Sequence, residues 1–172
     1  TVFGAVAGDA MAGWVRKEAS HLDFDVSEVD AAVSRCEKPF RSNPAKHGSL
    51  ERLRERLHEL MWEKVGIIRD DAGLRSALSG LSALGEELDR TAIADGNRAF
   101  NLTWHDGLNL KSLVQVSRVI AESALARTDS RGAHFREDFP EAGPLDQSAY
   151  TSARLKDGAS DIVMKPVAFT RV

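Results

Sequence analysis

The stretch "SLERLRERLHELMWEKV", residues 49–65, decides the fold class of this chain. Its apolar residues recur at steps of three and four, the spacing of one face of an α-helix: Leu50, Leu53, Leu57, Leu60, Met61 and Val65. The opposite face carries charges of both signs, as solvent-exposed helix surfaces do: Glu51, Arg52, Glu55, Arg56, Glu59 and Glu63. The stretch therefore predicts an amphipathic helix that buries one side against further helices.

Two further helical patterns follow this stretch. Asp70 or Asp71 is a suitable N-cap for the next helix, whose apolar stripe is Leu74, Leu78, Leu81, Leu84 and Leu88. The segment "IADGNRAFNLTWHDG", residues 93–107, breaks the periodicity. The last long helix is then expected over residues 108–127, with its buried side formed by Leu110, Leu113, Val114, Ser117, Ile120, Ala121 and Ala124.

The N-terminal part of the chain predicts two more helices. Residues 26–40 should form a helix with Ser27 as its N-cap, Pro39 near its end, and one stripe made of Val26, Val29, Val33, Cys36 and Phe40. Residues 2–22 are small and apolar, but Gly4, Gly8 and Gly13 weaken helix propensity by roughly 1 kcal/mol each. We expect this weak helix to pack closely against a neighbouring backbone.

The period changes after Pro140. Two short strand-like runs flank Asp157-Gly158, a turn pair typical of β-hairpins, and Pro166 favours an edge strand. The predicted fold is mainly α, an antiparallel bundle of three or four helices with a C-terminal β-hairpin tail.

Composition excludes several classes of protein. At 172 residues the chain suits one domain or one domain with a tail, and a net charge of −3 argues against a nucleic-acid partner. No apolar run approaches the length needed for direct membrane insertion. The single cysteine, Cys36, fits a reducing compartment such as the cytoplasm, and we interpret it as a buried small hydrophobic residue. Because the chain begins at Thr1 without methionine, we expect it to be a piece of a longer polypeptide or a processed chain.

Catalytic and metal-binding motifs are scarce in the sequence. There is no G-x-G-x-x-G, P-loop, H-E-x-x-H, C-x-x-C or G-x-S-x-G motif, and the five histidines are scattered without metal-ligand spacing. His105 and Asp106 could form a catalytic dyad, but neighbouring residues in a loop seldom point the same way. A turn at the start of a helix is the favoured interpretation of this pair.

The segment "RTDSRGAHFREDFP", residues 127–140, is the exception. Arg127 at the end of a helix would oppose the helix dipole, and Gly132 could provide a left-handed exit from the helix. Those two roles leave most of the charged side chains without a function, while guanidinium groups are well suited to bind carboxylates or carbonyls across an interface. The spacing alone leaves two readings open, an interface or site and a merely solvated loop.

Three segments carry a resemblance to a known family. "SRGAHFREDFPE" resembles a signature near the C-terminus of the flavoprotein subunits of succinate dehydrogenase and fumarate reductase and of the related L-aspartate oxidases. "RLRERLHELMWEKVGIIRDDAGL" resembles a helical segment of the same family, and its Met-Trp, Val-Gly-Ile and Arg69 fit the L-aspartate oxidases well. "TVFGAVAGDAMAG" resembles the stretch that closes the family's FAD-binding domain, and "KPVAFTRV" its final strand.

The resemblance implies a domain organisation and a fold. Residues 1–22 would be the last helix of an FAD-binding domain, residues 23–145 a helical C-terminal domain of spectrin-repeat-like shape, and residues 146–172 the hairpin tail. The longer protein would transfer hydride between FAD and a small dicarboxylate of the succinate, fumarate or L-aspartate type. The resemblance also implies that this chain contributes no catalytic, cofactor-binding or metal-binding residue.

The resemblance implies partners as well. These are the FAD-binding and capping domains of the same polypeptide, with an iron–sulfur subunit as a further candidate that would bring the protein to the inner face of the membrane. We expect the interface between domains to be lined by Arg127, Ser130, Arg131, His134, Arg136 and Asp138. The alternative is a free-standing helical module that binds a protein partner without redox chemistry, and an enzyme complete within this chain, acting through His105 and Asp106, ranks last.

Overall fold

The computed structural model describes all residues except 1, 21–22, 42–48, 157–158 and 169–172. The chain divides into two compact units, residues 1–35 and residues 36–172, and each is described by itself. The predicted domain boundary at residue 22 falls outside the described residues and stays a prediction, as does the boundary at residue 145.

The first unit contains helix α1, Val2–Glu18, and most of helix α2, Val26–Glu37. The predicted N-cap of α2 is wrong. Asp25 is the cap, because its carboxylate accepts from the Ser27 backbone N–H at 2.8 Å and its carbonyl accepts from the N–H groups of Glu28 and Val29. Ser27 therefore lies in the first turn of the helix.

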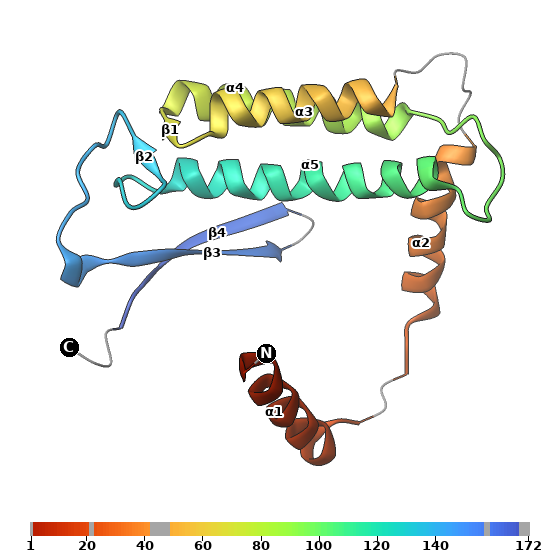
Figure 1. Ribbon diagram of the computed structural model, residues 1–172, viewed down its shortest axis with the longest axis horizontal. Coiled ribbons are helices and arrows are strands. Elements are labelled where there is room, and N and C mark those ends of the chain that lie inside the picture. The colour runs from red at the N-terminus through yellow and green to blue at the C-terminus, as the bar shows by residue number, and fades with distance from the viewer. Residues whose placement is uncertain (1, 21–22, 42–48, 157–158, 169–172) are drawn as a thin grey trace. The chain divides into compact units, whose positions relative to one another are not determined.

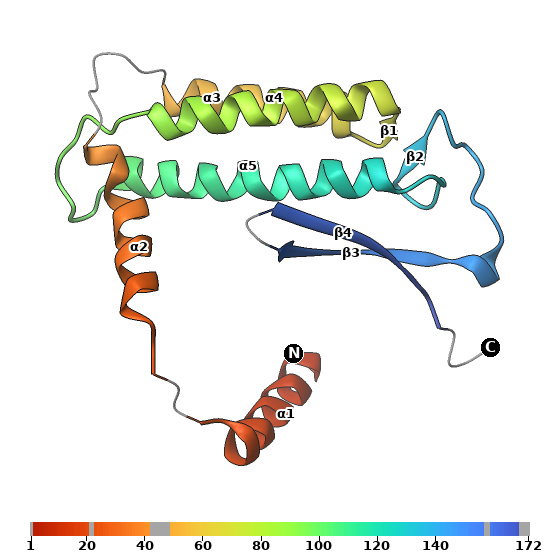
Figure 2. The same ribbon diagram turned by 180° about the vertical axis from the view of Figure 1, so that it is seen from behind.

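Helices α3, Leu50–Val65, α4, Asp71–Arg90, and α5, Leu102–Ala126, form the body of the second unit. They lie side by side and alternate in direction (Figures 1 and 2), which confirms the predicted antiparallel bundle. Asp70 is the N-cap of α4, since its carboxylate accepts from the Gly73 N–H at 2.5 Å. The apolar stripes meet in a core made of Leu53, Leu57, Val65, Leu74, Ala77, Leu81, Leu84, Leu88, Leu110, Ala121 and Ala124.

The buried side of α5 is narrower than predicted. Leu113 and Ile120 are each 44% exposed, so their predicted burial is wrong. Small residues, Ser117, Ala121 and Ala124, face α3 and α4 instead. Leu110 also belongs to the core, whereas Leu113 and Ile120 lie beside this seam. A seam of small side chains lets neighbouring helices approach closely.

Helix α5 begins six residues earlier than predicted. Asn101 caps it through its side-chain oxygen, which accepts from the Trp104 N–H at 2.9 Å, while its amide group donates to the carbonyls of Asp95 and Asn97 at 3.0 and 2.7 Å. The Trp104 indole N–H donates to the Cys36 carbonyl at 2.8 Å, and Cys36 itself is only partly buried. These contacts extend the helix through the stretch that lacks apolar periodicity.

Two pairs of strands complete the second unit. Strand β1, Ile68–Arg69, pairs in parallel with strand β2, Phe135–Arg136, and so joins the α3–α4 connection to the segment after α5. Strands β3, Ala149–Lys156, and β4, Ala159–Pro166, form the predicted antiparallel hairpin, which lies along α5 (Figures 1 and 2). The predicted turn residues Asp157 and Gly158 lie outside the described residues. None of the described helices is both long and apolar enough to cross a membrane.

Candidate functional site

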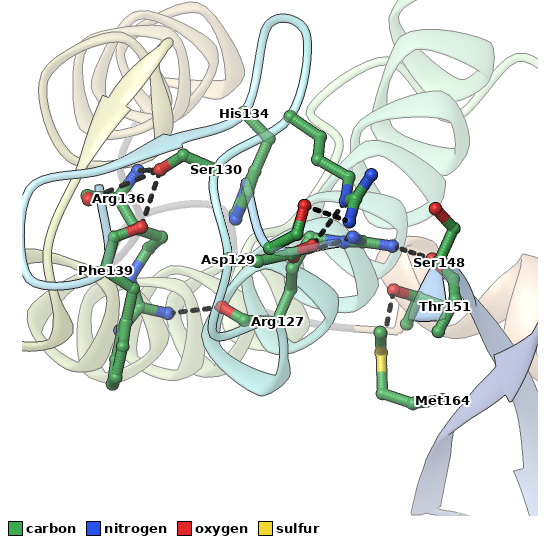
Figure 3. Close-up of polar contacts among 12 residues, drawn as sticks. Arg127, Asp129, Ser130, His134, Arg136, Phe139, Ser148, Thr151 and Met164 are labelled. Carbon is green, nitrogen blue, oxygen red and sulfur yellow. Dashed lines mark hydrogen bonds and ion pairs between the residues drawn. The ribbon is translucent and has the colours of Figure 1, made fainter. Parts of the chain in front are cut away.

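Residues 127–141, which we call the charged loop, leave the end of α5 and fold into a compact structure (Figure 3). Arg131 and His134 exchange two backbone hydrogen bonds of 2.9 and 3.0 Å, and Gly132 lies between them at φ +56°. Gly132 thus has the predicted left-handed conformation, but it forms this turn rather than the helix exit. Helix α5 instead ends at Ala126, and the following residue, Arg127, has an extended backbone conformation.

Arg136 is the centre of the charged loop. Its side chain is only 1% exposed, and one guanidinium nitrogen, Nη1, donates to the carbonyls of Ala124, Leu125 and Arg127 at 3.0, 3.2 and 3.0 Å. The last carbonyls of a helix have no partner within the helix and carry its negative dipole end. Arg136 therefore caps α5, a role that the sequence assigned to Arg127.

Asp138 completes the environment of Arg136. Its two oxygens accept from Arg136 Nε and Nη2 at 2.7 and 2.6 Å, a bidentate ion pair, and the hydrogen bonds from Arg136 lower the pKa of Asp138 to about 2. One of these oxygens also accepts from the Asp71 N–H at 3.2 Å. The same pair thus connects the end of α5 to the beginning of α4.

Ser130 fixes the backbone of the charged loop from inside. It is 7% exposed, and its hydroxyl accepts from the Arg136 N–H at 2.8 Å and donates to the Phe139 carbonyl at 2.8 Å. The Phe139 ring lies over the Arg136 guanidinium, 5.0 Å from its centroid to the guanidinium carbon. A single hydroxyl therefore holds both ends of the turn that presents Arg136.

Asp129 joins the other two arginines of the loop. Its oxygens accept from Arg127 at 2.8 Å and from Arg131 at 2.6 Å. Partial burial alone would raise the pKa of Asp129, but the hydrogen bonds and charges of Arg131 and Arg127 hold it below its ordinary value. Arg127 also donates to the Ala149 carbonyl of β3, so this network fastens the hairpin to the loop.

His134 contacts an arginine from outside the loop. Arg69 on β1 lies with Nη1 2.5 Å from His134 Nδ1, and its Nε donates to the Gly66 carbonyl at 2.5 Å. Burial, followed by the positive charges of Arg69, Arg127 and Arg136, lowers the pKa of His134. The neutral form of the ring is therefore favoured. Arg69 was noticed in the sequence only for its resemblance to a family motif, and its proximity to His134 was not predicted.

The structure thus brings all six predicted interface residues together in one loop. Ser130 and Arg136 are buried and act within the chain, whereas Arg127, Arg131 and His134 are partly exposed. The predicted role of all six residues at an interface between domains stays a prediction. His105 and Asp106 lie in the first turns of α5, where Asp106 pairs with Arg54 at 3.3 Å. Within the described ranges no three His, Cys, Asp or Glu side chains are placed to hold a metal ion.

Comparisons with known proteins identify the family. The family model for the fumarate reductase flavoprotein C-term matches residues 54–172. The chain is 31% identical to the succinate dehydrogenase flavoprotein subunit of Coxiella burnetii over 166 residues, covering 96% of this chain and 27% of that protein. It is 38% identical to L-aspartate oxidase 1 of Ralstonia nicotianae over 90 residues, covering 52% of this chain and 16% of that protein.

A solved structure agrees with these matches. The quinol fumarate reductase of E. coli aligns with 99% of this chain and 30% of its own, with a TM-score of 0.86 and 25% sequence identity. The chain therefore spans between about a sixth and a third of the length of these relatives. Its helical bundle, its hairpin and the family match over residues 54–172 lead to one conclusion: the chain belongs to the fumarate reductase flavoprotein C-terminal family.

Proposed function

We propose that this chain is the C-terminal helical domain of an FAD-dependent oxidoreductase that acts on a small dicarboxylate, and that it supports the catalytic domains without reacting itself. The family match over residues 54–172 carries the proposal, together with the small share of each relative that the chain covers. The matched relatives are a succinate dehydrogenase subunit, fumarate reductase subunits and an L-aspartate oxidase, which suggests a dicarboxylate substrate.

The described residues do not fit FAD. Dinucleotide sites of this kind are built on a parallel βαβ unit with a glycine-rich turn at a helix N-terminus. Strands β1 and β2 are only two residues long, and β3 and β4 form an antiparallel hairpin. We therefore assign FAD to other domains of the longer polypeptide and derive no catalytic step from this chain.

The charged loop and its surroundings are the candidate contact face for those domains. Ile67, Ile68 and Phe135 expose 63%, 62% and 39% of their surface beside Arg131 and His134. Apolar side chains bordered by arginine are typical of protein interfaces. Because Ser130 and Arg136 hold the loop rigid from inside, its exposed residues are already ordered for docking, which lowers the entropic cost of association.

The test compares the 172-residue chain with the longer polypeptide. Ile68→Asp adds a charge at an exposed position, so the 172-residue chain should keep its thermal stability. The longer polypeptide carrying Ile68→Asp or Arg131→Ala should lose flavin, measured as the ratio of flavin to protein absorbance, and should lose turnover of a dicarboxylate. Leu155→Asp, at a position 70% exposed near the far end of the hairpin, is the matched control.

Unchanged flavin content and turnover in both loop variants would contradict the role of this face. A longer reading frame without a G-x-G-x-x-G segment upstream of Thr1 would contradict the flavoenzyme assignment itself.

A further inference from the structure

A pocket of about 290 Å³ lies beside the charged loop, between α5 and the hairpin. Arg69, Arg127 and His134 line one side, Val119 and Ile120 of α5 form an apolar wall, and Thr151 of β3 borders it. Its volume lies just below the roughly 300–1,000 Å³ of sites that enclose drug-sized ligands. The pocket therefore suits a small ligand or a single side chain.

Arg69 differs from the other arginines at this end of the bundle. Arg127 and Arg131 both pair with Asp129, and Arg136 pairs with Asp138. Among the described residues, Arg69 has no carboxylate within ion-pair distance and contacts only backbone carbonyls and His134. A partly buried cation without a counter-ion is costly, and burial accordingly lowers the pKa of Arg69.

His134, like Arg69, lacks a negatively charged or hydrogen-bond-accepting partner. A guanidinium has only donors, so His134 Nδ1 accepts from Arg69, and the proton of the neutral ring must reside on Nε2. His134 Nε2 is buried and has no hydrogen-bond partner in the described part of the chain. Buried donors in folded proteins nearly always have an acceptor, so this N–H needs one.

We propose that the pocket binds a carboxylate. One carboxylate would neutralise the unpaired guanidinium of Arg69, while its carbon chain lies against Val119 and Ile120. A small rotation of the His134 ring would open the buried Nε2–H to the pocket, where it donates to the same carboxylate. Planar carboxylates match the fork of an arginine, and the apolar wall favours an organic acid over inorganic phosphate. The carboxylate can come from a free small acid or from an Asp or Glu side chain of another domain of the longer polypeptide.

The first experiment uses the 172-residue chain labelled with ¹⁵N-histidine. Acetate, succinate and inorganic phosphate are titrated at constant ionic strength while the imidazole ¹⁵N signals are followed by NMR. Acetate and succinate should shift the His134 Nε2 signal saturably, and phosphate should bind more weakly. The exposed His58 on α3 should show no saturable shift. The absence of a saturable shift at His134 would overturn the proposal.

Variants test which side chains hold the carboxylate. Arg69→Gln should weaken acetate binding by about tenfold or more, because a charge-assisted hydrogen bond is lost. Arg75→Gln, which removes an exposed arginine paired with Asp71, is the matched control and should leave binding unchanged. Because Arg69 also contacts the end of α3, Thr151→Phe provides a second test that fills the pocket from the hairpin. Full acetate affinity in Thr151→Phe would overturn the proposal.

A second arm, which alone rests on the proposed function, identifies the source of the carboxylate. If a side chain of the longer polypeptide supplies it, the His134 signal of that polypeptide already lies at the acetate-saturated position, and acetate has no effect. If a free acid is the ligand, acetate shifts the signal in both proteins. The proposal would be overturned if the His134 signal of the longer polypeptide lay at the acetate-free position and acetate did not shift it. Failure of the flavoenzyme assignment would leave the result of the first experiment unaffected.

Discussion

Replacing Arg136 by methionine tests the interpretation of the charged loop most directly. Methionine keeps much of the side-chain volume and removes all the donors. Three carbonyls at the end of α5 would lose hydrogen bonds of 3.0–3.2 Å from a charged group, and Asp138 would lose a bidentate partner. Because the side chain is only 1% exposed, water cannot replace it without opening the loop.

The expected loss of stability follows from these contacts. Hydrogen bonds to charged groups contribute about 1.5–3 kcal/mol each, so three independent bonds would give about 4.5–9 kcal/mol. The three carbonyls share one nitrogen and can partly reach water after local opening, which brings the estimate to about 3–5 kcal/mol, the range for breaking a buried ion pair. That is a large part of the 5–15 kcal/mol typical of a domain.

Urea unfolding of the 172-residue chain, followed by circular dichroism, measures this loss. Arg131→Met is the matched control, because Arg131 belongs to the same loop but its side chain is 26% exposed and contacts Asp129 and two exposed carbonyls. We expect the control to lose about 1 kcal/mol of unfolding free energy. Arg136→Lys should recover part of the stability lost in Arg136→Met, because lysine restores the charge but not the planar fork. Equal losses for Arg136→Met and Arg131→Met would refute the assignment of Arg136 as the cap of α5.

Three further predictions use the same chain. Asn101→Ala should lose about 1–2 kcal/mol in urea unfolding, since it removes the N-cap of α5; a change near zero would contradict that role. Gly66→Ala should lose about 1–3 kcal/mol, because a Cβ there would stand 2.7 Å from the Trp62 carbonyl oxygen. Gly85→Ala, with ordinary contacts, should instead be neutral or stabilising. His134 should titrate below its ordinary pKa of 6.5 in NMR. Its contribution to stability is complete above the unfolded pKa and is lost as the pH falls through the lower folded pKa; a folded pKa above 6.5 would contradict its burial among arginines.

The helices that could be predicted are those whose burial pattern is local. In α3 and α4 every turn contributes apolar residues to one side, so periodicity indicated their positions. The residue types before α4 left Asp70 and Asp71 as candidate caps, and the structure selects Asp70. The start of α5 was missed because its first turns depend on Asn101 and on the contact from Trp104 to Cys36, which lies 68 residues away. Asn101 stands directly before an apolar residue, which is a capping signal in the sequence. The polar residues around it interrupt the apolar periodicity by which a helix is recognised.

The charged loop shows a different limit of prediction from the sequence. Its composition identified it as the unusual segment, yet composition could not show which arginine reaches which acceptor. Arg127 is next to the helix end in sequence, but its side chain points to β3, and Arg136 returns nine residues later to the carbonyl of Arg127. Arg69 lies 65 residues from His134. Such assignments depend on the path of the backbone, which charge patterns do not encode.

The connections of the charged loop determine how changes in it would spread. Arg136 contacts the end of α5, Asp138 contacts the beginning of α4, and Glu137 donates its N–H to the Arg69 carbonyl of β1 at 2.8 Å. Arg127 holds β3. Each connection uses a different residue, so a substitution at one exposed position should leave the others in place, whereas loss of Arg136 frees the turn on which several depend. In a longer polypeptide, flavin loss caused by Arg131→Ala without loss of domain stability would therefore indicate a contact at the surface, while flavin loss with unfolding would indicate collapse of the loop from within.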